Sequence, residues 1–184
     1  MAARRAAGPF FLIILCAFLV RATLLQAFTI PSGSMTPTLE PGDHVVVTPY
    51  GNILHKERPS RGDVIVFRSP GDNGVYLAKR VVAVPGDHVE IRHGEVWLNG
   101  RLLDEPYVQK PKLGEQVAPQ TLPQGRYFVL GDHRVDSVDS RTWGFLDERM
   151  ILGKARLIFW SRDEEQGGPP IELIRWERIF RPVR

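Results

Sequence analysis

The sequence predicts a mainly β protein in which antiparallel strands follow one N-terminal transmembrane helix. Three observations support this prediction. Residues 10–20 contain no polar side chain apart from a lone cysteine thiol. After residue 30 the chain breaks into short runs rich in Val, Ile and aromatic residues, and Gly, Pro and Asp separate these runs. Beyond residue 30 no amphipathic helix of useful length is present, so we expect the body of the chain to be all-β.

Length and composition exclude several classes of protein. The chain has 184 residues, of which 43% are hydrophobic and 24% are charged, and its net charge is +3. These values exclude a disordered, collagen-like or polytopic membrane protein, and the scattered basic residues argue against nucleic acid as a partner. The single cysteine, Cys16, excludes an internal disulfide and a cysteine-rich zinc site. With no metal-ligand cluster and no glycine-rich phosphate loop, we expect no metal and no cofactor.

The apolar N-terminus predicts a membrane anchor at residues 9–27. As a helix, residues 9–25 would rise ~25 Å, so a span of the roughly 30 Å hydrocarbon layer requires Arg21 to reach the interface. Arg4 and Arg5 place residues 1–8 in the cytoplasm and residues 28–184 across the membrane. The alternative is a cleavable signal peptide ending near Ala27. Arg21, directly behind the apolar run, favours the retained anchor.

Seven strands are expected in the body of the chain, at residues 44–48, 64–68, 75–84, 88–92, 95–98, 127–130 and 151–160. Turn signals at residues 40–43, 69–74, 85–87, 92–94 and 98–100 separate them. This number of strands can close or sandwich a core. Residues 109–124 include three prolines and are expected to form a long surface loop.

Ser34 is a candidate nucleophile. It lies between Pro31 and Pro37 and directly after Gly33, so its backbone is held out of both a helix and a central strand. This setting can present a hydroxyl to a substrate, although plain linkers have the same composition. The candidate bases among the histidines are His44, His55, His88, His93 and His133, in patterns that are also typical of solvated histidines at strand ends.

Lys79 is an unusual residue in an otherwise apolar predicted strand. Alternation places Lys79 on one face with Leu77 and Val81, and Arg80 on the other face. One of these two charges must therefore point toward a buried side unless the strand is an edge. Burial lowers the pKa of a lysine and leaves a neutral amine, which can take the hydroxyl proton of a serine.

Residues 131–144 form a third polar cluster, which contains three Asp, two Ser and two Arg residues. The cluster fits a solvated loop. It equally fits a hydrogen-bonded network in which Asp139 and Arg141 form a structural ion pair and Ser137 orients a neighbouring amine.

Taken together, these segments resemble the type I signal peptidases, the bacterial leader peptidases of the serine–lysine class. The matching motifs occur in family order behind the apolar N-terminus, at residues 31–39, 42–47, 61–67, 79–87 and 131–144. The resemblance implies an antiparallel β-sheet serine–lysine protease fold with a small inserted β region at about residues 87–123. The family usually carries Asn, Asp and Asn where this chain has His133, Val135 and Asp136, which changes the electrostatics of that loop.

The resemblance also implies roles for individual residues. Ser34 would be the nucleophile and Lys79 the general base, while the Ser32 hydroxyl and the Ser34 N–H would form the oxyanion hole. Ser137 would hydrogen-bond the Lys79 amine, with Asp139 and Arg141 as structural support. By position, the candidates for the walls of a substrate pocket are Phe28, Ile30, Met35, Leu77 and Ala78.

The implied function is that of a membrane-bound serine endopeptidase that removes signal peptides from exported preproteins after small-x-small sites. Its partners would be preprotein signal peptides and the lipid bilayer, and its location the bacterial cytoplasmic membrane with the catalytic domain outside. A maturation peptidase of conjugation or pilus systems is one alternative, and a membrane-tethered β binding module is another. The aromatic and arginine residues at 159–160 and 174–181 are typical of interface-seeking segments and also of a packed tail.

Overall fold

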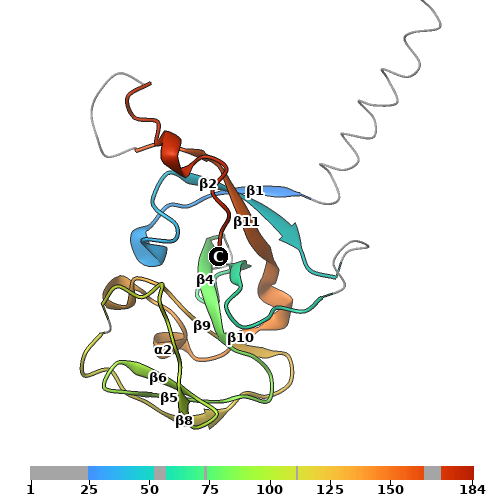
Figure 1. Cartoon of the computed structure of the whole chain (residues 1–184). Helices are drawn as coiled ribbons and strands as arrows, with labels where there is room; N and C mark the ends of the chain where they lie inside the picture. The colour runs from blue at the N-terminus through green and yellow to red at the C-terminus, as the bar shows by residue number, and fades with distance from the viewer. Residues whose placement is uncertain (1–24, 52–56, 73, 111, 164–170) are drawn as a thin grey trace, which may run out of the picture.

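The described residues form two antiparallel sheets, and the smaller sheet lies at one end of the larger one (Figure 1). The computed structural model describes residues 25–51, 57–72, 74–110, 112–163 and 171–184. The larger sheet has the order β1 (Gln26–Thr29), β2 (Asp43–Pro49), β11 (Ile151–Ser161), β3 (Val64–Arg68), β4 (Tyr76–Ala83), β9 (Arg126–Leu130) and β10 (Leu146–Asp147). The smaller sheet has the order β7 (Arg101–Leu102), β6 (Glu95–Leu98), β5 (His88–Arg92) and β8 (Val117–Thr121). The prediction of a mainly antiparallel β fold is confirmed.

The larger sheet is buried on both faces, and its sequence shows why. In β3, Val64 and Val66 pack into one apolar cluster with residues of β2 and β11, while Ile65 and Phe67 pack into another with residues of β9. A continuous apolar run is typical of a strand that is covered on both sides. In the neighbouring strand β4, residues 79–83 are buried, whereas Tyr76 is exposed and Leu77 and Ala78 are half-buried.

The smaller sheet lies between residues 87 and 123, the range of the expected inserted β region, and occupies the lower end of the molecule in Figure 1. It packs against Val82, Phe128 and Leu130 of the larger sheet. The expectation of a loop at residues 109–124 is wrong for β8, which pairs with β5. Pro119 argued against a strand, but β8 is an edge strand, where a missing backbone N–H is tolerated.

All seven expected strands are present, with ends that differ by one residue or less. The sequence patterns missed β1, β7, β8 and β10, three of which have four residues or fewer. Of the expected anchor, residues 9–24 lie outside the described residues, and Gln26 and Ala27 belong to β1. No helix among the described residues is long and apolar enough to cross a membrane.

The C-terminal segment, residues 171–184, is tied to the loop that follows Ser34. It includes the short helix η4 (Trp176–Arg178). Buried Arg178 donates hydrogen bonds to both carboxylate oxygens of Asp43, at 3.0 and 2.5 Å, and to Glu40 at 2.9 Å. Burial alone would raise the pKa of Asp43, but the hydrogen bonds from Arg178, Glu40 N–H and Ser161 outweigh it and hold this pKa below its usual value.

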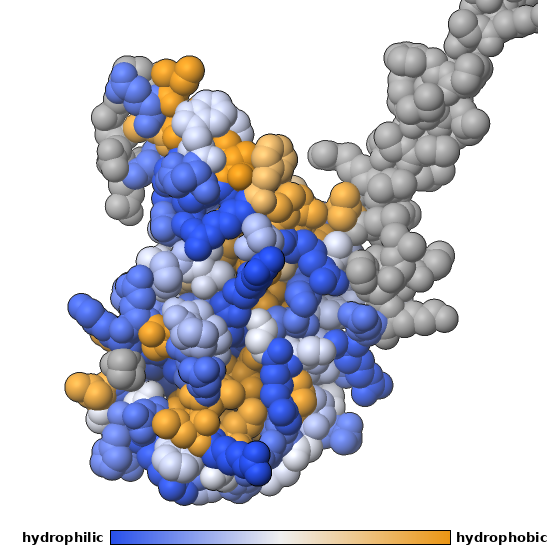
Figure 2. Space-filling view, viewed as in Figure 1, coloured by the Kyte–Doolittle hydropathy of each residue, from blue (hydrophilic) through white to orange (hydrophobic). Residues whose placement is uncertain are grey.

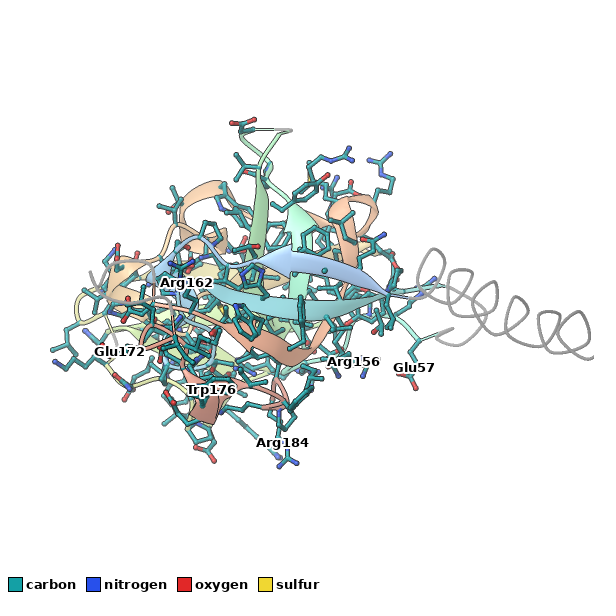
Figure 3. All side chains as sticks on the ribbon, turned by 90° about the horizontal axis from the view of Figure 1, so that it is seen from above. Glu57, Arg156, Arg162, Glu172, Trp176 and Arg184 are labelled. Carbon is teal, nitrogen blue, oxygen red and sulfur yellow. The ribbon has the colours of Figure 1, made fainter. Side chains whose placement is uncertain are left out.

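Seen from above, Arg162 and Glu172 lie at one end of the β1–β2 pair and Glu57 at the other (Figure 3).

Candidate active site

Ser34 lies in a single turn of 3-10 helix, η1 (Gly33–Met35), which is separated from the end of β1 by residues 30–32. Met35 is buried and anchors this turn in the core. The Ser34 carbonyl accepts a hydrogen bond from the backbone N–H of His133 at 3.1 Å, which ties the turn to the loop at residues 131–144. The Ser32 hydroxyl lies 3.3 Å from the Ser34 hydroxyl. The turn therefore presents two hydroxyl groups side by side.

The Lys79 side chain contacts the Ser34 side chain, although 45 positions separate the two residues in the sequence. The Lys79 Nζ is 2.6 Å from the Ser34 Oγ, so a proton can pass directly between the two groups. Lys79 lies in the middle of β4, which fixes its backbone, and only 2% of it is exposed. Its neighbour Arg80 is equally buried, so both charges of this strand point into the protein.

Burial lowers the pKa of Lys79 toward the range that a general base needs. Loss of hydration lowers the pKa of the Lys79 amine from 10.5 to about 8, and Arg141 acts in the same direction. Asp139, Asp132 and Asp136 act in the opposite direction because their carboxylates favour the protonated amine. At pH 7 about one-tenth of such an amine is neutral, several hundred times more than for an ordinary lysine.

This pKa predicts the pH dependence of a reaction in which Lys79 is the base. The neutral amine is the active form, so kcat/KM should rise with pH, pass its midpoint near pH 8 and then level off. A series of rate measurements on one peptide substrate from pH 6 to pH 10 gives the midpoint. A midpoint near 6.5, the value for histidine, would contradict the assignment of the base to Lys79.

A buried network holds the loop beside the dyad. The Asp139 carboxylate is fully buried and accepts hydrogen bonds from Arg141 Nε at 2.8 Å, from Gly131 N–H at 3.0 Å and from the Ser137 hydroxyl at 2.7 Å. Burial would raise the pKa of Asp139, but these bonds, led by Arg141, keep it below the usual value. Asp139 also caps the short helix α2 (Ser140–Trp143). The structure thus pairs Asp139 with Arg141.

Ser137 differs in detail from its expected arrangement. Among the described residues its hydroxyl donates to Asp139, and no hydrogen bond joins it to Lys79. Because the Ser137 proton points toward Asp139, the oxygen lone pairs remain available to accept a hydrogen bond from an amine. The predicted orienting role therefore requires Lys79 or Ser137 to move from this arrangement.

Gly131 is a residue of the site that the sequence patterns did not single out. A Cβ atom at this position would lie 2.5 Å from the Ser34 carbonyl oxygen and would also collide with the Ser137 hydroxyl. Only glycine lets the loop approach Ser34 this closely. Gly131 begins the polar cluster at residues 131–144, but nothing in the sequence shows that it approaches Ser34.

Arg80 joins the site to the rest of the fold. Its guanidinium binds both carboxylate oxygens of Asp132, with Nε–Oδ1 at 2.8 Å and NH2–Oδ2 at 2.6 Å, and both side chains are almost fully buried. The Thr38 hydroxyl donates a hydrogen bond to Asp132 Oδ2 at 2.5 Å. The Tyr107 ring packs over the guanidinium, with 3.9 Å between the Arg80 Cζ and the ring centroid. This pair connects β4, the loop after Ser34 and the loop after β9.

An apolar pocket opens beside Ser34 between β1 and β4. It is a small pocket that is partly open to solvent, and its lining includes all five predicted wall residues, Phe28, Ile30, Met35, Leu77 and Ala78. Val66 and Tyr76 also line it, and the sequence patterns did not indicate either. Phe28 and Tyr76 meet edge to face across its mouth, with ring centroids 5.4 Å apart. The pocket contains no charged residue, so it fits small apolar side chains.

The histidines serve other contacts. His44 bonds to Thr29 at 3.0 Å and His88 to Thr121 at 3.1 Å, each on the surface of a strand pair. His133 contributes its backbone N–H to the Ser34 carbonyl, and His55 lies outside the described residues. In the described part of the chain, no three His, Cys, Asp or Glu side chains come together as a metal site.

Comparison with known proteins identifies the family. The family described as "Signal peptidase, peptidase S26" matches residues 3–160. The chain belongs to this family. The match covers the Ser34 turn, Lys79 and the loop at residues 131–144, and the chain is a serine endopeptidase of that family.

Several S26 peptidases are similar over most of the chain. Signal peptidase I of Leptolyngbya laminosa is 38% identical over 161 residues, which are 82% of this chain and 77% of that protein. The probable signal peptidase I-1 of a Synechocystis species is 40% identical over 159 residues, 80% of each chain. A crystal structure of a signal peptidase I from Enterococcus faecalis is 37% identical, covers 53% of this chain and 97% of its own, and superposes with a TM-score of 0.46.

Proposed function

We propose that this chain removes signal peptides from exported preproteins by cutting after a small-x-small sequence, with Ser34 as nucleophile and Lys79 as general base. The observation that carries the proposal is the 2.6 Å contact between Ser34 Oγ and a buried lysine amine. The membership of the S26 family supports the reaction class. The apolar pocket beside Ser34 supports the preference for small residues.

The first half of the reaction forms an acyl-enzyme. The neutral Lys79 amine takes the proton of the Ser34 hydroxyl, and Oγ attacks the carbonyl carbon of the residue before the cut. The Ser34 N–H and the Ser32 hydroxyl stabilise the negative charge that develops on the carbonyl oxygen. When the C–N bond breaks, the Lys79 ammonium gives its proton to the leaving amine, and an ester on Ser34 remains.

The second half releases the signal peptide. The Lys79 amine, neutral again, removes a proton from a water molecule, and the hydroxide attacks the ester carbonyl. The same two donors hold the second oxyanion. Breakdown of this intermediate returns the proton from Lys79 to Ser34 Oγ and frees the carboxylate of the signal peptide. Asp139 and Arg141 hold the surrounding loop throughout.

The backbone around the pocket offers two free edges to an extended substrate. β9 pairs with Arg80, Val81 and Ala83 of β4, so among the described residues positions 76–79 pair on the β3 side only. β1 is an edge strand that pairs with β2. A substrate in extended form can therefore add as a strand beside the pocket. Every second side chain would point into the pocket, which gives the spacing of a small-x-small rule.

The test is cleavage of a purified preprotein with an Ala-x-Ala site by the full-length chain in detergent. Mass spectrometry of the products should place the cut after the second Ala, and replacement of that Ala by Leu should abolish the cut. Cleavage elsewhere, or no cleavage by a folded protein, would contradict the proposed substrate. A pilus-type substrate cut by the same Ser34 would then replace it.

The C-terminal segment supports contact with the bilayer. Trp176, Phe180 and Ile171 are 62%, 73% and 67% exposed, and Trp176 stacks edge to face on Trp160. Apolar side chains appear at this corner of the molecule beside hydrophilic ones (Figure 2). Exposed aromatic residues among arginines fit the headgroup region of a membrane. We place this corner at the bilayer surface on the extracytoplasmic side, with the part of residues 9–27 that precedes β1 as the anchor.

Tryptophan fluorescence tests the contact. In vesicles whose lipids carry bromine at a shallow depth, part of the fluorescence of the full chain should be quenched because Trp176 and Trp160 touch the interface. Replacing both by Phe should remove most of the quenching, whereas the matched change Trp97→Phe, in the smaller sheet, should leave it unchanged. Equal quenching in all three proteins would contradict the placement.

A further inference from the structure

Ser34 lies between two pockets. The first is the apolar pocket described above. The second is lined by Ser69 and Gly71 of the β3–β4 turn, by Asp136 and Val138 of the loop after β9, and by Trp143. Ser32, Ser34 and Leu77 line both pockets, and Lys79 lines the second. The mechanism above uses the first pocket and leaves the second without an occupant.

Apart from Leu77, which borders both pockets, the β4 residues that line them lie on opposite faces of the strand, Tyr76 and Ala78 in the first pocket and Lys79 in the second. Ala78 packs with the cluster around Val66 and lines the first pocket, whereas Leu77 packs with the cluster around Phe67. Lys79 shares the face of Leu77. Successive side chains of a substrate extended along β4 must therefore alternate between the two faces. If the last residue before the cut occupies the first pocket, the residue directly after the cut points toward the second.

Asp136 gives the second pocket a negative charge. It is exposed, and among the described residues its carboxylate has no hydrogen bond and no ion pair. The other two aspartates of this loop, Asp132 and Asp139, are buried and bound to arginines. Asp136 is therefore the carboxylate of the loop that is free to meet a ligand. Its negative charge also contributes to the potential at Lys79.

We propose that this second pocket receives the first residue of the released protein and that Asp136 selects for a basic or neutral side chain there and against an acidic one. The inference rests on the proposed function, because it needs a scissile bond at Ser34. The chemical class of the favoured ligand is an extended peptide with a cationic side chain directly after the cut.

The experiment compares three peptides that are identical except for Lys, Gln or Glu directly after an Ala-x-Ala site. For the full-length chain in detergent, kcat/KM should fall in the order Lys, Gln, Glu, with a ratio of Lys to Glu of roughly three- to fivefold, as expected for two exposed charges. The ratio should approach one in Asp136→Asn and should invert in Asp136→Lys. Salt of about 1 M should also reduce the ratio in the unchanged protein because it screens the interaction.

The matched control is Glu95→Gln, which removes an exposed carboxylate from the smaller sheet and should leave the ratio unchanged. A ratio that is the same in Asp136→Asn and in the unchanged protein would overturn the inference while cleavage itself upholds the proposed function. A charge preference confined to the middle residue of Ala-x-Ala would also overturn it, since the pocket would then hold a residue before the cut. Failure to cut any of the three peptides would instead reject the proposed function.

Discussion

Lys79→Arg should lower kcat/KM for preprotein cleavage by about 10⁴-fold or more, as loss of one member of a catalytic unit does in other serine hydrolases. Arginine keeps the positive charge and much of the length of the side chain, but its guanidinium does not lose a proton in proteins. It therefore cannot take the proton from the Ser34 hydroxyl 2.6 Å away. Lys79→Ala should be equally inactive. Because Arg keeps the positive charge and Ala does not, an equal loss in both variants would show that Lys79 is needed for proton transfer rather than for its charge.

A matched change keeps this result interpretable. Lys110 is exposed in a loop, and Lys110→Arg should leave kcat/KM within twofold of the unchanged protein. Circular dichroism of the Lys79 variants should show the same β content as the unchanged protein, because Lys79 contributes a buried charge rather than apolar packing. Substantial cleavage by folded Lys79→Arg would show that another group is the base.

Asp132→Asn should lower the free energy of unfolding by about 3–5 kcal/mol, the usual cost of leaving one member of a buried ion pair without its partner. The Arg80 guanidinium would remain 2% exposed and would lose the carboxylate that now binds it at 2.8 and 2.6 Å. Thr38 would also lose a charged acceptor. Urea unfolding followed by fluorescence gives the change.

Asp147→Asn provides the comparison for this prediction. Asp147 also binds an arginine through two hydrogen bonds, but its partner Arg149 is 87% exposed. Water replaces the lost contact there, so the loss of stability should be much smaller. If the two substitutions lowered the free energy of unfolding equally, burial of the Arg80–Asp132 pair would not explain the loss of stability in Asp132→Asn.

Individual strands could be predicted where their own residues form a recognisable hydrophobic run. The runs at residues 64–67 and 151–160 are rich in Val, Ile, Leu and aromatic residues, so they identified β3 and β11. β1 and β10 could not be found in this way, because their four and two residues are strands only through pairing with β2 and β9. Their hydrogen-bond partners lie 15 to 21 residues away along the chain. Local sequence does not encode such pairing.

The two members of the dyad could be singled out because each breaks a local pattern. Ser34 stands between prolines, and Lys79 is a charge in an apolar strand. The sequence left open whether Lys79 or Arg80 is buried, and the structure buries both, because sheet and loop residues cover both faces of β4. Gly131 and Tyr76 could not be assigned, since their importance depends on close approaches to Ser34 and Phe28 that only the fold creates.

The most direct test of the central claim is to find the acyl group. The full-length chain would be incubated with a peptide ester or a β-lactam-type acylating agent, digested and mapped by mass spectrometry. One adduct is expected, on Ser34, which should be absent from Ser34→Ala and should form far more slowly in Lys79→Arg. An adduct on Ser32 instead, or equal acylation of Ser34 in Lys79→Arg, would contradict the serine–lysine mechanism proposed for this chain.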